Sequence, residues 1–185
     1  MTVEALAVIL CLAKPTFSHG QTWNEAECLD QAKEIQAAAE VHGIDTKLIV
    51  AVNIHECDLR SGIVRPIWQE FGTGRRKKRV QIGADLCPMG LRVFGPVDRV
   101  KWTDAAIYME AARKMDRWKK WCDHDHGGAH HFISHYNQGN SVYQFQILAI
   151  RRALAGKPLL KGEEGLLTER TLEIVKRLTR VFKKA

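Results

Sequence analysis

The chain has 185 residues, of which 45% are hydrophobic and 26% are charged, with only 14 Gly and 5 Pro. This composition excludes collagen-like and disordered proteins and predicts one domain with a substantial core. The 28 Lys and Arg residues outnumber the 21 Asp and Glu residues. The formal net charge of +7 is expected to attract polyanions such as nucleic acid, anionic lipid or an acidic cell-wall polymer.

Near the N-terminus lies an apolar run of nine residues, from Ala5 to Ala13. A helix that crosses a bilayer needs about 20 apolar residues, so no transmembrane segment is expected. The run is followed by Lys14, Pro15 and a polar stretch, which predicts a secretory signal segment over residues 1–20 and a secreted or periplasmic location in a bacterial cell envelope. The alternative is a buried first helix of a cytosolic protein, because no basic residue precedes the run.

The cysteines also bear on whether the protein is exported or cytosolic. Without residues 1–20 an even set remains, namely Cys28, Cys57, Cys87 and Cys122. In an oxidising compartment three pairings are possible, and we predict at least one disulfide. Buried free thiols in a reducing compartment are the alternative.

Apolar periodicity predicts a mainly α fold. One helix is expected over residues 25–41, ending at Gly43, and a nearly all-apolar central helix over residues 46–57, with Asp45 as its N-cap. Further helices are expected over residues 103–121, 130–136, 140–155 and 168–184. Between residues 61 and 96, Gly and Pro interrupt every pattern, which predicts a long loop with at most a short hairpin around residues 79–82. Taken together, these elements predict a single domain over residues 25–185, with its core at residues 28–155.

Glu56 is the most informative polar residue, because it ends the apolar helix and is followed at once by the turn-forming Cys57 and Asp58. Partial burial and a helix C-terminus both raise the pKa of a carboxyl group, which suits a general acid. The alternative is a salt bridge to Arg60, four residues on.

Three motifs occur in order along the chain. They are Gly43-Ile44-Asp45 with the helix to Glu56-Cys57, then Pro88-Met89-Gly90-Leu91-Arg92-Val93-Phe94-Gly95-Pro96, then His135-Tyr136-Asn137-Gln138-Gly139. Together they resemble the Glu-Ser, Gly-Leu-Met-Gln and Tyr-Asn-x-Gly motifs of soluble-lytic-transglycosylase-like and goose-type lysozyme-like domains.

The resemblance implies a lysozyme-like helical fold and cleavage of the β-1,4 bond between N-acetylmuramic acid and N-acetylglucosamine in peptidoglycan, without a metal or organic cofactor. Glu56 is then the catalytic acid and base. The substrate-binding positions carried over are Tyr136, Asn137, Met89, Gly90, Leu91 and Gly139. Peptidoglycan strands are the expected partner of a monomeric enzyme.

This chain departs from the family pattern at three positions. Cys57 stands where the family usually has Ser, while Arg92 and Val93 replace the Met and Gln of the second motif, which leaves the substrate preference open. No second carboxylate carries a matching signature, so Asp58, Asp85 and Asp98 all remain candidates for a base.

Other features favour different functions. The stretch from Asp123 to His135 is rich in His, and His131 and His135 lie one helical turn apart, so a metal-dependent hydrolase is an alternative. A non-catalytic glycan-binding module is another. Several aromatic residues are candidates for stacking on sugars or for the core, namely Trp68, Phe71, Trp118 and Trp121. The basic run over residues 75–79 and the cationic face of the last expected helix are predicted to bind acidic wall polymers, and no nucleic-acid motif accompanies them.

Overall fold

The computed structural model describes residues 1–13, 24–60, 62–97, 101–125 and 131–182, and it is mainly helical with one small sheet. Its α-helices are α1 (Val3–Ala13), α2 (Glu25–His42), α3 (Thr46–Cys57), α4 (Asp104–Asp125), α5 (Ser141–Leu154) and α6 (Glu169–Phe182). Short 3-10 helices are η1 (Gly74–Arg76), η2 (Phe132–Asn137) and η3 (Glu163–Leu166). The strands are β1 (Val64–Phe71), β2 (Lys78–Leu86) and β3 (Leu91–Phe94). In the described part of the chain no helix is both long and apolar enough to cross a membrane.

The predicted central helix is confirmed. Every side chain of α3 from Leu48 to Ile54 is buried. The side chain of Asp45 caps its start by accepting from the amide of Lys47, and Gly43 ends α2 in the left-handed conformation with a φ of 60°. These local signals are strong because each satisfies backbone groups that a helix end leaves unpaired.

A buried polar network fastens α3 to its neighbours. The hydroxyl of Tyr108 on α4 accepts hydrogen bonds from Asn53 on α3, at 2.6 Å, and from Gln31 on α2, at 2.7 Å. Because buried polar groups are costly unless they are paired, this network favours one arrangement of the three helices. The C-terminal end of α3 is therefore held in a fixed place.

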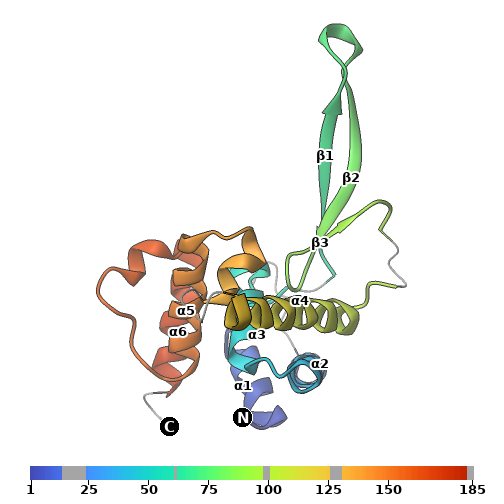
Figure 1. Cartoon of the computed structure of the whole chain (residues 1–185). Helices are drawn as coiled ribbons and strands as arrows, with labels where there is room; N and C mark the ends of the chain where they lie inside the picture. The colour runs from blue at the N-terminus through green and yellow to red at the C-terminus, as the bar shows by residue number, and fades with distance from the viewer. Residues whose placement is uncertain (14–23, 61, 98–100, 126–130, 183–185) are drawn as a thin grey trace.

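The expectation of a long loop over residues 61–96 is wrong. This segment forms an antiparallel sheet of order β1-β2-β3, and β1 and β2 extend away from the helical body as a long hairpin (Figure 1). Nearly every residue of β1 is exposed or half-buried. Since both faces of the outer part of the hairpin meet solvent, its sequence lacks the alternation of apolar and polar residues that marks a half-buried strand.

Smaller differences concern the later helices. The third expected helix continues to Asp125 instead of ending near residue 121, and the expected fourth helix is the short η2. Residues 126–130, where the expected fourth helix begins, lie outside the described residues. Helix α5 matches its prediction, with Asn140 capping its start, and α6 packs against α1 and α5.

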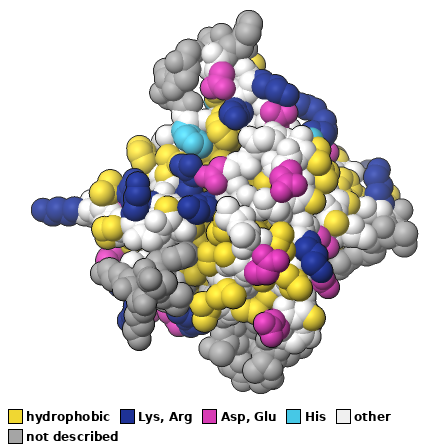
Figure 2. All heavy atoms as spheres, turned by 90° about the horizontal axis from the view of Figure 1, so that it is seen from below, with side chains coloured by type: hydrophobic (Ala, Val, Ile, Leu, Met, Phe, Trp, Pro, Cys, Tyr) yellow, Lys and Arg dark blue, Asp and Glu magenta, His cyan; other side chains and the backbone are white. Residues whose placement is uncertain are grey.

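Residues 3–13, within the predicted signal segment, form α1, which packs against α2. Leu6 and Leu10 are fully buried, while Val8 and Leu12 are exposed on the outer side. A disulfide joins Cys11 of α1 to Cys28 of α2. Hydrophobic side chains are visible over part of the face that lies away from the hairpin (Figure 2).

Candidate active site

Glu56 lies in the last turn of α3, at the edge of a small cavity. The cavity has a volume of about 170 Å³. It is lined by Glu56, Asp85, Gly90, Arg92, Lys114, Tyr136, Asn137 and Gln138. These residues come from α3, β2, the turn after β2, β3, α4 and η2, so the site is assembled from segments far apart in the sequence.

Four of the predicted site residues line this cavity, and the other three support it. Met89 is fully buried, and its carbonyl accepts a hydrogen bond of 3.0 Å from the hydroxyl of Tyr136. Leu91 is buried in the core at the start of β3. Gly139 lies in the turn that follows η2, where its positive φ of 80° suits glycine.

Gly90 is pressed directly against the carboxyl group of Glu56. A Cβ atom at Gly90 would lie 2.6 Å from Oε2 of Glu56 and 2.9 Å from its Cδ. The backbone of Gly90 also has a φ of +60°, a conformation that residues with side chains rarely adopt. Only glycine allows the turn after β2 to cover this carboxyl group so closely.

The environment of Glu56 favours the protonated acid. Burial is the main cause that raises its pKa above the usual range, and the negative charge of Asp85 raises it further. Tyr143, Arg65 and Lys114 act in the opposite direction. A carboxyl group whose pKa is raised, at the edge of an open cavity, is suited to donate a proton to a bound substrate.

Tyr143 of α5 lies behind Glu56. Its ring is buried and packs edge-on against His55, with centroids 5.1 Å apart. Its hydroxyl has no partner of standard hydrogen-bond geometry among the described residues, yet it lies close enough to Glu56 to lower the pKa of the carboxyl group. The two groups are therefore neighbours.

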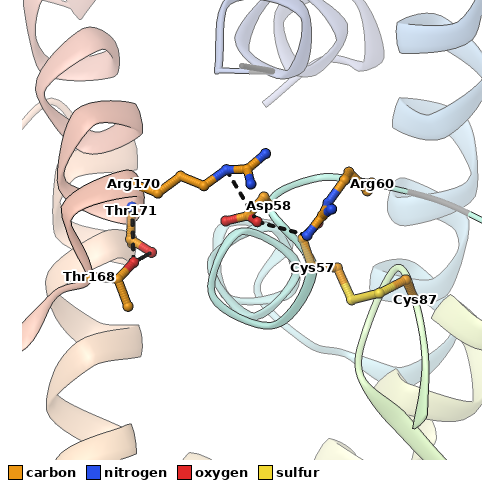
Figure 3. Close-up of polar contacts among 7 residues, drawn as sticks. All are labelled: Cys57, Asp58, Arg60, Cys87, Thr168, Arg170 and Thr171. Carbon is orange, nitrogen blue, oxygen red and sulfur yellow. Dashed lines mark hydrogen bonds and ion pairs between the residues drawn. A yellow bond between two sulfur atoms is a disulfide. The ribbon is translucent and has the colours of Figure 1, made fainter. Parts of the chain in front are cut away.

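The alternative expectation for Glu56 was a salt bridge to Arg60, and the structure does not contain this salt bridge. Arg60 pairs with Asp58 at 3.1 Å, and Arg170 of α6 approaches the same carboxylate oxygen at 3.3 Å (Figure 3). Asp58 thus links the end of α3 to α6. These ion pairs occupy its carboxylate, and Asp58 is absent from the lining of the cavity.

Asp85 is the second carboxylate of the cavity. It lies opposite Arg92 in the register of β2 and β3, and the Arg92 guanidinium donates to both of its oxygens, at 2.8 and 3.0 Å. Arg92 therefore holds the carboxylate in place. Asp98, the third acid considered, lies outside the described residues.

A disulfide ties the two sides of the site together. Cys57, the neighbour of Glu56, is bonded to Cys87, three residues before Gly90 (Figure 3). The pair is one of those expected from the sequence. The remaining cysteine, Cys122, is a buried free thiol.

The sequence pattern did not identify Lys114, Gln138 and Tyr143 as members of the site or its support, whereas Asp85 was one of three candidate bases. Burial lowers the pKa of Lys114, whose ammonium group donates to the carbonyl of Tyr136 at 3.3 Å and lies 4.6 Å from the centroid of the same ring. In the sequence, the spacing of Lys114 shows only that it lies next to the apolar face of α4. No local signal distinguishes it from a surface lysine.

The His-rich stretch forms no metal site in the part that the structure describes, where no three His, Cys, Asp or Glu side chains converge. His131 caps η2 by accepting from the amide of Ile133 at 3.3 Å. His135 stacks on Trp118. Residues 126–130 of the stretch lie outside the described residues.

A scan against models of known protein families found no match for this chain. Searches of curated protein sequences and of solved structures found no significant match either.

Proposed function

We propose that the protein is a peptidoglycan-cleaving enzyme, a lytic transglycosylase or lysozyme-type muramidase with a lysozyme-like fold. The observation that carries the proposal is Glu56: a half-buried carboxyl group with a raised pKa, packed under Gly90 at the edge of a polar cavity. The three family-like motifs supply Glu56, Gly90, Tyr136 and Asn137 to this cavity from three separate segments.

In the proposed reaction Glu56 donates its proton to the glycosidic oxygen as the bond from that oxygen to C1 breaks. The N-acetyl group of the sugar stabilises the positive charge that develops at C1. The ionised Glu56 then takes the proton of the 6-hydroxyl group while the 6-oxygen bonds to C1, which closes an anhydro ring without consuming water. One residue therefore serves as acid and then as base.

The neighbours of Glu56 fit supporting roles in this scheme. The exposed amide of Asn137 can hydrogen-bond the N-acetyl group, and Tyr136 fixes the turn that holds Gly90 through its bond to Met89. Asp85, held by Arg92, keeps negative charge near Glu56 and so favours its protonated form. If the products carry added water instead of an anhydro ring, Asp85 is the carboxylate in position to activate that water.

The proposed location is the bacterial cell envelope, outside the cytoplasm, which suits the Cys57–Cys87 disulfide. The proposed partners are peptidoglycan strands in the cavity and acidic wall polymers on the hairpin. The hairpin and its tip, residues 64–82, carry six basic residues and one acidic residue, so most of the chain's excess positive charge lies there.

The test is the clearing of a suspension of purified cell walls, with and without a chelator. The wild type is expected to clear it in both conditions, and Glu56→Gln is expected to clear it in neither. Binding to the walls without clearing would instead assign a non-catalytic glycan-binding module. Clearing that the chelator abolishes would assign a metal-dependent hydrolase.

A further inference from the structure

A cluster of aromatic side chains lies where α4 meets η2. The ring of Trp118 stacks on His135, with centroids 4.8 Å apart and planes at 20°. Trp121 meets His135 edge-on at 5.0 Å and Trp118 edge-on at 5.5 Å. Two tryptophans and a histidine thus form one contiguous aromatic surface.

The cluster shares its two elements, α4 and η2, with residues that line the cavity. Lys114, Trp118 and Trp121 are spaced four and three residues apart on α4, so they lie along one face of the helix. Lys114 lines the cavity, and His135 immediately precedes Tyr136, another lining residue. Seven residues of helix span about 10 Å, which is roughly the length of a disaccharide.

The cluster belongs only partly to the core. The core side of α4 carries Ala111, Ala112 and Met115, all fully buried. By contrast, 36% of Trp121 is exposed, and Trp118 and His135 are only half-buried. An exposed indole next to a polar cavity combines a flat apolar face with one hydrogen-bond donor.

We propose that Trp118, Trp121 and His135 form a sugar-binding subsite that holds the part of a glycan strand extending beyond the Glu56 cavity. The apolar face of a pyranose ring stacks on Trp121, while Trp118 and His135 fix the orientation of that indole. The occupant is a β-1,4-linked strand of N-acetylated amino sugars. This inference rests on the proposed function and adds to it a preference for long substrates.

The experiment measures the affinity of soluble N-acetylglucosamine oligomers, a disaccharide and a hexasaccharide, for inactive Glu56→Gln protein by calorimetry. Against this background, Trp121→Ala is expected to weaken hexasaccharide binding about fivefold and to leave disaccharide binding unchanged. Trp121→Phe, which keeps a flat ring, should recover most of the loss. Phe145→Ala, which removes an exposed aromatic ring from α5, is the matched control and should change neither affinity.

The outcomes separate the subsite from the proposed function. Equal affinities of Trp121→Ala and its parent for the hexasaccharide would overturn the subsite alone. So would an equal loss for both oligomers, since that would show that Trp121 supports the cavity instead of extending it. If the parent binds neither oligomer and the wild type leaves cell walls intact, the proposed function falls and the subsite with it.

Discussion

Gly90 and Glu56 are packed so closely that no methyl group fits between them, because a Cβ atom at Gly90 would lie 2.6 Å from Oε2 of Glu56. This contact places the turn after β2 over the carboxyl group and excludes water from one side of it. It also explains why a glycine occupies this point of the second motif.

We therefore expect Gly90→Ala to lower the rate of wall cleavage at least about tenfold, since the methyl group must displace Glu56 or the turn and the positive φ adds about 1–2 kcal/mol of strain. Gly95→Ala is the matched control. Gly95 also has a positive φ, of 86°, but a Cβ atom there would meet nothing within 4 Å. Cleavage assays on both folded variants decide the matter, and full activity in Gly90→Ala would contradict the assigned contact.

The pH dependence follows from the raised pKa of Glu56. Only the protonated acid can donate a proton, so the rate is expected to fall as the pH rises through this pKa. Asp85→Asn removes a negative charge that raises the pKa, so the alkaline limb of the rate profile should move to lower pH. Asp116→Asn, which changes a surface residue paired with Lys120, should leave the limb in place. A shift to higher pH in Asp85→Asn would refute the electrostatic role of Asp85.

The Cys57–Cys87 disulfide should matter for both stability and activity. Its loop of about 30 residues corresponds to roughly 3–4 kcal/mol of stabilisation in the chain-entropy account. The double variant Cys57→Ala/Cys87→Ala is expected to unfold at a lower temperature and to cleave more slowly, because Glu56 and Gly90 lose their covalent link. Replacing the free thiol in Cys122→Ala tests for a general effect of losing a cysteine. If the double variant keeps wild-type melting and activity, the disulfide has no role in the site.

The central helix and its cap were predictable because their causes are local. Asp45 and Gly43 act on the backbone within a few residues of themselves, and α3 is apolar on every side. The hairpin was not predictable, since its largely solvent-exposed strands follow no apolar period that would mark them or set their register.

The residues of the site also divide into those that the sequence could identify and those that it could not. Glu56 was identified as an anomaly within an apolar helix, and Gly90, Tyr136 and Asn137 through their motifs. Lys114 and Tyr143 carry no such mark, because they approach Glu56 only through the packing of α4 and α5 around α3. Asp85 was visible as one acid among three, and the geometry alone separates it from Asp58.

The hairpin should hold the enzyme on anionic wall polymers. Replacing the five basic residues at 75–79 by Gln is expected to weaken binding to cell walls mainly at low salt, since exposed charges are screened over about 8 Å at physiological ionic strength. Turnover of short soluble glycans should be unchanged. Neutralising five lysines elsewhere gives the same net charge, and the control set is Lys33, Lys119, Lys120, Lys157 and Lys161. Equal loss on walls and on soluble glycans would show that the hairpin shapes the active site.

The most direct test is the mass spectrum of the fragments released from purified peptidoglycan by the wild type and by Glu56→Gln. The substitution keeps the shape of the side chain and removes its ionisable proton. The wild type should release disaccharide fragments with anhydro ends, lighter by one water than hydrolysed ends, and Glu56→Gln should release none while retaining its melting temperature. The same fragments released at similar rates by both proteins would contradict the assignment of Glu56 as the catalytic acid.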